Sequence, residues 1–221
     1  WQHGGTELGM EVRHLGLPYI AWMNPYPLLP CHTVIASAEH RPQDWRIPGS
    51  LTLAELIDDL LQLAAELPGW IGFYNGVGAG ASIPHHLHYH FLPRPAGYER
   101  MPIERLDGRY PVRFMHWRGN KPAVLDQAKE WLKDWQTSAG NVDETSANLI
   151  VCADQTQTID FYFVPRCKHR SRADGLHGVI GGFEVMGEIV CSTPEEQQRL
   201  DSGLLDYKAV SDMLAQVSVA V

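Results

Sequence analysis

The 221-residue sequence predicts an α+β fold, an antiparallel sheet covered by helices and built from two similar halves. Short runs of β-branched and aromatic residues alternate with turns rich in proline and glycine, as strands of such a sheet do. Each half also carries one long amphipathic helical pattern between its strands. Finally, residues 160–166 echo residues 88–94. We therefore divide the chain into residues 1–100, a catalytic half, and residues 101–221, a degenerate copy of it.

The first half is predicted to run β-β-α-β-β. Strands are expected at 19–23 and 32–37, joined by a turn that contains two prolines. A helix follows, because Thr52 and Glu55 form a capping box and apolar residues recur at helical spacing until Pro68-Gly69. Two more strands, at 70–74 and up to Pro93, flank a glycine-rich loop.

The second half repeats this order less clearly. Strands are expected at 112–117, 148–152 and 159–164, with a helix whose apolar face spans 124–135. In the echo of the first half, Thr158, Asp160 and Tyr162 stand where three histidines stand earlier. We interpret the segment as a repeat that kept its packing and lost its nucleophile. Helices beginning near Thr193 and at about 207–214 close the chain.

Composition excludes several classes of protein. The formal net charge of −8 disfavours broad nucleic-acid binding, and no apolar run approaches the length that spans a bilayer. We expect a cytoplasmic protein, and because the chain begins at Trp1 and not at a methionine, we also expect a natural N-terminal segment before it. The four cysteines have no CxxC spacing and are expected to be reduced and buried: Cys31, Cys152, Cys167 and Cys191.

Three histidines at alternate positions, His86, His88 and His90, are the strongest functional signal. Alternate side chains of a strand share one face, so the three imidazoles are predicted to line one site. Such a site can attack phosphorus with one ring and hold phosphate oxygens with the others. His88, in the middle, is the predicted nucleophile, which must be neutral at the attacking nitrogen while the other nitrogen is held by a carbonyl.

The loop before the histidines supplies neutral groups for an anion. Backbone amides of Gly80 and Ala81 can approach a phosphate closely, as backbone nests do. Asn75 and Ser82 add side-chain hydrogen bonds. Arg94, just after the strand, is either a phosphate contact or an exposed arginine at a strand end.

Two other interpretations of the histidines were weighed. Three histidines also suit a Zn²⁺ site, but no carboxylate or cysteine nearby completes the ligand shell. A purely structural cluster would leave polar rings that have to be solvated or paired. His85 points away from the other three by alternation. We therefore predict no metal at the histidines.

At these residues the sequence resembles the histidine-triad superfamily, whose motif alternates three histidines with apolar residues and ends in two apolar residues. Residues 86–92 fit the motif fully, and Asn75 stands eleven residues before His86, where the family places Asn or Gln. Asn24 to Pro30 and the following strand look like an upstream family element, with Cys31 in place of a usual glycine.

Two segments are similar to the branch with galactose-phosphate uridylyltransferase, diadenosine tetraphosphate phosphorylase and GDP-hexose phosphorylases. They are residues 80–85, Gly-Ala-Ser-Ile-Pro-His, and residues 182–188 with the Thr-Pro-Glu-Glu-Gln that follows. His90 is a departure, because the uridylyltransferases have glutamine there. An extra residue after Pro84 and the absence of their zinc-binding cysteine pair are others.

The resemblance implies a histidine-triad-like fold and transfer of a nucleotide through a nucleotidyl-histidine on His88. The donor would be a nucleoside diphosphate-sugar or a dinucleoside polyphosphate, with Asn24 near the nucleoside. No cofactor is expected beyond Mg²⁺ on the substrate's own phosphates. No nucleic acid or membrane partner is expected, and a homodimer is compatible with the family. The alternatives are a nucleotide hydrolase, a nucleotide-binding sensor without activity, and a metal-dependent hydrolase.

Overall fold

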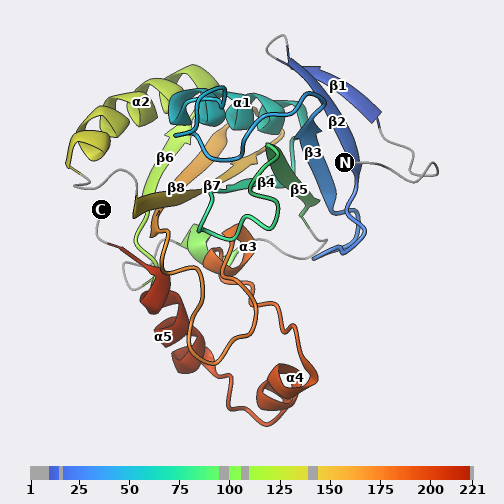
Figure 1. The fold of residues 1–221 in the computed structure, drawn as a ribbon, viewed down its shortest axis with the longest axis vertical. Helices are drawn as coiled ribbons and strands as arrows, with labels where there is room; N and C mark the ends of the chain where they lie inside the picture. The colour runs from blue at the N-terminus through green and yellow to red at the C-terminus, as the bar shows by residue number, and fades with distance from the viewer. Residues whose placement is uncertain (1–9, 15–16, 95–99, 106–109, 139–143, 220–221) are drawn as a thin grey trace.

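All the described strands form one antiparallel sheet, as predicted. The computed structural model describes residues 10–14, 17–94, 100–105, 110–138 and 144–219 (Figure 1). The eight strands follow the order β1-β2-β3-β5-β4-β7-β8-β6. Their bounds are β1 Met10–His14, β2 Leu17–Met23, β3 Thr33–Ser37, β4 Trp70–Asn75, β5 His88–Pro93, β6 Met115–Gly119, β7 Thr145–Ala153 and β8 Ile159–Cys167.

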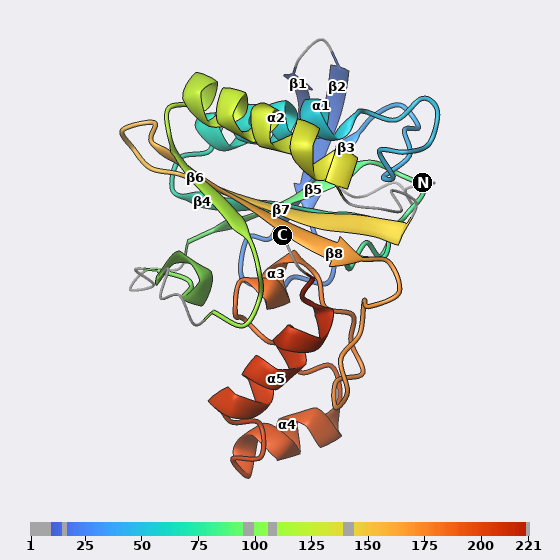
Figure 2. The ribbon, with the colours of Figure 1, turned by 90° about the vertical axis from the view of Figure 1, so that its left-hand side faces the viewer.

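The helices lie in two layers, one on each side of the sheet (Figure 2). Helices α1 (Leu53–Glu66) and α2 (Lys121–Ser138) pack side by side over one face. The other face carries the short α3 (Gly182–Val185), with α4 (Pro194–Asp201) and α5 (Tyr207–Val217) beyond it. A 3₁₀ turn, Pro102–Arg105, lies between the halves in sequence.

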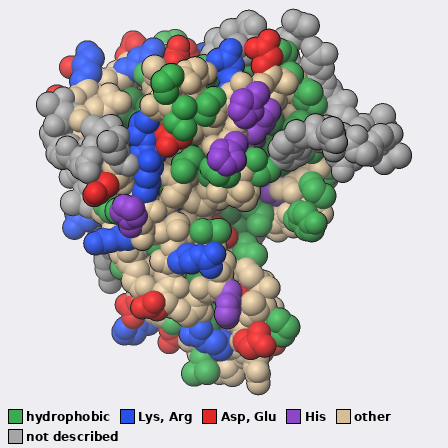
Figure 3. Space-filling model, viewed as in Figure 1, with side chains coloured by type: hydrophobic (Ala, Val, Ile, Leu, Met, Phe, Trp, Pro, Cys, Tyr) green, Lys and Arg blue, Asp and Glu red, His purple; other side chains and the backbone are tan. Residues whose placement is uncertain are grey.

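The surface has no single dominant sign of charge on the face seen in Figure 1. Basic and acidic side chains are interspersed there, as Figure 3 shows. Within the described residues, the longest helices are too short or too polar to cross a bilayer.

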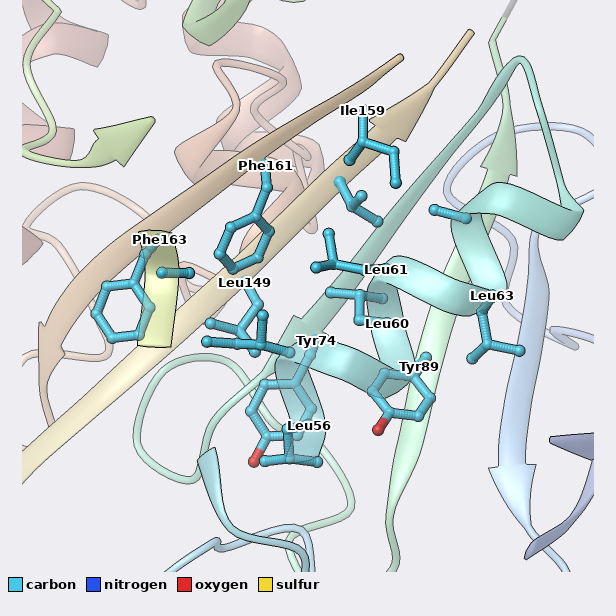
Figure 4. Packing of buried hydrophobic residues seen from close by; sticks show 14 of the residues in the cluster. Leu56, Leu60, Leu61, Leu63, Tyr74, Tyr89, Leu149, Ile159, Phe161 and Phe163 are labelled. Atoms are coloured by element: carbon cyan, nitrogen blue, oxygen red, sulfur yellow. The ribbon is translucent and has the colours of Figure 1, made fainter. Parts of the chain in front are cut away.

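Local sequence accounts for α1 and for the core beneath it. Thr52 and Glu55 form the predicted capping box, with Thr52 Oγ1 accepting from the Glu55 amide. The apolar face of the helix, including Leu56 and Leu60, packs on Tyr89 and on residues of β7 and β8 (Figure 4). Burying each such leucine stabilises the fold by about 1.5–3 kcal/mol.

The strands of the two halves pair in the same order and register on either side of the β4–β7 contact, so that β3, β5 and β4 correspond to β6, β8 and β7. In the first half His88 of β5 lies opposite Ala36 of β3, and in the second Asp160 of β8 lies opposite Arg118 of β6. The inner neighbours match as well, because Phe73 of β4 pairs with His90 and Ile150 of β7 pairs with Tyr162. The sequence echo and the strand register therefore coincide. Both halves contribute to the same sheet.

Several boundaries differ from the prediction. The strand expected at 112–117 is β6, which spans Met115–Gly119, and Val112 lies before it, buried in the cluster on the other face of the sheet. β7 and β8 are longer than predicted, and β1 and α3 were not predicted.

The expectation that all four cysteines are buried is confirmed for Cys152 alone, because Cys167 and Cys191 are half-buried and Cys31 is exposed. Cys31 also adopts a positive φ of 63°, in the left-handed region that glycine enters without strain. A glycine at this position would adopt the same φ without strain. All four cysteines, each within the described residues, are free thiols.

Candidate active site

A cavity of about 330 Å³ lies between the sheet and the C-terminal segment that carries α3. Its floor comes from β4 and β5, and its rim from the β2–β3 turn, the glycine-rich loop and residues 179–184. The lining residues are Asn24, Tyr26, Leu28, His32, Phe73, Asn75, Gly80, Ser82, His90, Val179, Gly181, Phe183 and Glu184.

His88 is held in the protonation pattern that a nucleophile needs. Its Nδ1 lies 2.8 Å from the carbonyl oxygen of His86, and a carbonyl only accepts, so Nδ1 carries the proton. The remaining nitrogen, Nε2, then carries a lone pair. Among the described residues this buried atom has no hydrogen-bond partner. The ring of His88 stands edge-on to His90, with centroids 5.0 Å apart.

Gln43 fixes the backbone on which His88 sits. Its side chain is fully buried, accepts from the His88 amide at 2.8 Å, and donates to the carbonyls of His88 and Asn75. One amide side chain therefore ties the start of β5 to the end of β4. Sequence reasoning missed Gln43, because a glutamine in a turn carries no recognisable pattern.

His90 is held as a hydrogen-bond donor toward the cavity by a neighbouring histidine. The Leu28 amide donates to Nδ1 of His32, so the proton of His32 is on Nε2. That nitrogen lies 3.0 Å from Nδ1 of His90 and donates to it. Neutral His90 must then carry its own proton on Nε2. The His90 ring is also stacked on Phe73, at 4.8 Å between centroids, which limits its rotation.

The histidines of the site are neutral near pH 7. Burial lowers the pKa of His88, and the hydrogen bond to the His86 carbonyl only partly opposes this effect. Burial lowers the pKa of His90 well below its usual range, and the neighbouring His88 and His32 lower it further. Burial alone lowers the pKa of His32 to about 4. A neutral His88 is the form that can attack phosphorus.

These lowered pKa values predict a protein that loses stability in mild acid. Below pH 6.5 the unfolded chain protonates these histidines, whereas the folded chain protonates His32 only near pH 4. The unfolded state therefore binds more protons, and the free energy of unfolding falls as the pH drops through this window. Each such histidine contributes a slope of at most about 1.4 kcal/mol per pH unit.

Denaturant titrations at a series of pH values measure this slope. His32→Asn should flatten it between pH 6.5 and about 4, relative to the wild-type protein. An unchanged slope in folded His32→Asn would contradict the assignment of His32 as a buried neutral ring.

The glycine-rich loop and the C-terminal segment meet backbone to backbone at the rim. A Cβ on Gly80 would lie 2.3 Å from the Gly181 Cα, so no side chain fits there. The Gly182 amide donates to Asn75 Oδ1 at 2.7 Å, and the Gly181 amide donates to Glu184 Oε2 at 2.8 Å. Burial raises the pKa of Glu184 despite the bond from Gly181.

The structure brings together most, but not all, of the predicted site residues. His90, Asn24, Asn75, Gly80 and Ser82 line the cavity. His88 lies directly beside it, against His90.

Three predicted residues lie apart from that cavity's lining. His86 precedes β5, and its Nε2 lies 2.6 Å from the Ser37 carbonyl, so only two of the three histidines share the strand. Ala81 is half-buried in the loop. Arg94 forms a two-pronged ion pair with Glu104 near the other half.

Sequence reasoning assigned no role at the site to His32, Phe73 or Glu184, which the structure adds. The signals were present but incomplete. His32 begins the predicted second strand, and Glu184 lies in the segment similar to the uridylyltransferases. Neither pattern shows that these residues, more than 100 positions apart, face one cavity.

A second cavity, of about 370 Å³, occupies the matching place in the second half. Asp160, which takes the position of His88, accepts from His116 at 2.8 Å and pairs with Arg118 at 2.5 Å. Burial opposes ionisation of Asp160, but these partners lower its pKa overall. Arg94 lines this cavity instead of the one beside His88. Within the described ranges, no cluster of three or more His, Cys, Asp or Glu residues is arranged to hold a metal ion.

Comparison with known proteins supports the fold. Residues 10–93 match a family described as "Domain of unknown function (DUF4922)". No curated protein matches the chain in sequence. The chain is similar in structure to yeast Ap4A phosphorylase Apa2, with a TM-score of 0.65 and 18% identity over 92% of this chain and 72% of that chain.

Two further structures of the same yeast enzyme are similar. In its complex with AMP the TM-score is 0.66 at 19% identity, covering 94% of this chain and 74% of the enzyme. In its complex with Ap4A the values are 0.65 and 16%, covering 92% and 74%. These likenesses confirm the predicted α+β, histidine-triad-like fold.

Proposed function

We propose that this protein is a nucleotidyl-transfer enzyme that forms a covalent nucleotidyl-histidine on His88. The observation that carries the proposal is the state of the His88 ring, whose Nδ1 proton is held by the His86 carbonyl while buried Nε2 keeps its lone pair. The donor is a dinucleoside polyphosphate or a nucleoside diphosphate-sugar. In support, two of the similar yeast structures are complexes, one with AMP and one with Ap4A.

The first step transfers the nucleotide to the enzyme. The lone pair of His88 Nε2 attacks the α-phosphorus, a P–N bond forms, and the P–O bond to the departing phosphate breaks with its electron pair on that oxygen. The modified ring becomes cationic, and the His86 carbonyl stabilises the proton on Nδ1. The Nε2–H of His90 and the amide of Asn75 donate to phosphate oxygens in the cavity.

The second step releases the nucleotide. An oxygen of inorganic phosphate, a sugar phosphate or water attacks the phosphorus and loses its proton to solvent. The P–N bond then breaks, and its electron pair returns to His88 Nε2. Phosphate as acceptor gives a phosphorylase and water gives a hydrolase, which is the alternative function. A chase of the labelled enzyme with and without phosphate distinguishes them, because the products are a nucleoside diphosphate and a nucleoside monophosphate.

Labelling the protein tests the proposal and its independence from metal. Incubation with α-³²P-labelled Ap4A or UDP-, GDP- and ADP-hexoses should leave acid-labile label on the protein. We expect the label to form in EDTA, because His90 and Asn75 supply donors without a metal. Mg²⁺ can increase the rate by binding substrate phosphates. If EDTA abolished labelling and Zn²⁺ alone restored it, a metal-dependent hydrolase would replace this proposal.

The matching position of the second half should not take part in the chemistry. Asp160 is paired with His116 and Arg118 at the second cavity, and its charge would repel a phosphate. Asp160→Asn is therefore expected to change the rate of label formation by less than about twofold, since Asp160 lines the second cavity and is not among the residues of the first. Loss of labelling in Asp160→Asn with an unchanged melting temperature would show that the second half has a catalytic acid.

A further inference from the structure

Arg166, at the end of β8, is a buried guanidinium that the proposed chemistry does not yet use. Its side chain is 1% exposed, and burial lowers its pKa to about 10. Nη1 donates to Asn148 Oδ1 at 2.6 Å and Nη2 donates to the Arg170 carbonyl at 3.2 Å. Within the described residues, Nε has no hydrogen-bond partner. Burying a cation without a hydrogen-bonded carboxylate is costly, so the position needs an explanation.

The hydrogen bonds of Arg166 lead directly to the candidate active site. Asn148, fully buried on β7, donates through Nδ2 to Asn75 Oδ1 at 2.8 Å and to the Ala79 carbonyl at 2.7 Å. Asn75 is the last residue of β4 and lines the cavity. β4 and β7 are neighbours in the sheet (Figure 1). In their register Asn75 lies opposite Asn148.

The donor and acceptor groups of Arg166, Asn148 and Asn75 allow only one orientation of the two asparagine amides. A guanidinium only donates, so it selects the oxygen end of the Asn148 amide. The nitrogen of Asn148 must then face Asn75, which has to present its own oxygen. The Gly182 amide, also a donor, selects the same end of Asn75. The NH₂ of Asn75 is thereby left for the opposite side, where it lies 3.5 Å from the Gly80 carbonyl at the cavity rim.

We propose that Arg166 is a positioning residue, which acts through Asn148 to hold the NH₂ of Asn75 toward the phosphates of the substrate. The inference rests on the proposed function, because the substrate has to be a phosphate ester for this donor to matter. It also gives the second half a role in the site of the first. Glu184, which lines the cavity, interacts electrostatically with Arg166, so the proposed role of Arg166 is to orient Asn75 and not to attract an anionic ligand directly.

The matching arginine of the first half supports the assignment. Arg94 follows Pro93 as Arg166 follows Pro165; Arg94 lines the second cavity, and Arg166 is connected to the first through Asn148 and Asn75. Arg94, however, is paired in two-pronged fashion with the carboxylate of Glu104. Arg166 has neutral amide and carbonyl partners among the described residues, so its charge is not cancelled by a hydrogen-bonded acid. Of the two cavities in the part of the chain that the structure describes, only the one beside His88 is connected to such an arginine.

The test measures label formation from α-³²P-Ap4A in a single turnover, together with AMP affinity. Arg166→Met removes charge and donor, and Arg166→Lys keeps both. We expect Arg166→Met to slow labelling about 10²-fold, as loss of precise orientation does, and Arg166→Lys to recover at least a tenth of the wild-type rate. The matched control is Arg118→Met, which removes an exposed arginine at the second cavity and should stay within twofold.

A double-mutant cycle separates positioning from general destabilisation. If Arg166 acts through Asn75, the Met substitution should add less than twofold to the effect of Asn75→Ala, because the amide it orients is gone. Full multiplication of the two effects, or a folded Arg166→Met protein with wild-type labelling, would overturn the proposal. Failure of the wild-type protein to label at all would instead overturn the proposed function.

A second variant covers the case in which Arg166→Met does not fold. Asn148→Asp keeps an acceptor for Arg166 but has no N–H for Asn75, so the Asn75 amide should turn its nitrogen inward. We expect a comparable loss of labelling, and a changed ¹⁵N resonance of the Asn75 side-chain amide, which is assigned with Asn75→Asp. The resonance does not depend on activity. An unshifted resonance with wild-type labelling would overturn the inference.

Discussion

Replacing His88 with alanine is expected to abolish nucleotidyl transfer while AMP affinity changes only a few-fold. The alanine removes Nε2, the atom proposed to form the P–N bond, whereas the donors proposed to hold phosphate belong to other residues, His90 and Asn75. Loss of a covalent nucleophile typically lowers kcat by several orders of magnitude, so we expect a decrease of about 10⁴-fold or more. Label formation in a single turnover measures the first step, and calorimetry with AMP measures binding.

The flanking histidines provide matched comparisons. His90→Ala removes one donor to the phosphate and is expected to cost about 10²–10³-fold in rate. His86→Ala should cost less than His90→Ala, because the group that orients His88 is the backbone carbonyl of residue 86, which the substitution retains. More than a few per cent of wild-type turnover in folded His88→Ala would exclude the covalent mechanism.

The elements that could be predicted from the sequence are those fixed by local interactions. The capping box at Thr52 lies within one turn of the helix it starts, and its partners are three residues apart. Likewise Leu87, Tyr89 and Phe91 are all fully buried, as alternation along a strand predicts. The candidate nucleophile follows from the same short motif, because its orienting carbonyl belongs to the residue two positions before it.

The parts that could not be predicted depend on contacts between distant segments. Residues 179–184, which form part of the cavity rim, are positioned by the close approach of Gly80 to Gly181. No periodic sequence pattern marks this segment. The positions of Arg94 and Arg166, each at the end of a strand of one half but connected to the cavity of the other half, also depend on such contacts. Arg94 follows the histidine strand but faces the second cavity, while Arg166 connects to Asn75, because β4 and β7 join the halves side by side.

Gly80→Ala should have the second largest effect on labelling, because Gly80 lies where the glycine-rich loop contacts residues 179–184. Gly80 has a φ of +96°, and its added Cβ would meet the Gly181 Cα at 2.3 Å, a backbone atom that cannot rotate away. The unfavourable φ alone costs about 1–2 kcal/mol. Relief of the clash has to move one segment, and a shift of about 1 Å at the site can cost about 10²-fold in rate.

Gly49→Ala separates strain from the clash. Gly49 has a similar φ of +85°, but nothing lies within 4 Å of its added Cβ. Gly49 is exposed and is not among the residues that line the cavity. We expect Gly49→Ala to lose about 1–2 kcal/mol of unfolding free energy with labelling unchanged. Gly80→Ala should lose more stability and most of its labelling. Because the two glycines share their conformation and differ in what surrounds them, equal effects on labelling would mean that the contact with Gly181 does not shape the site.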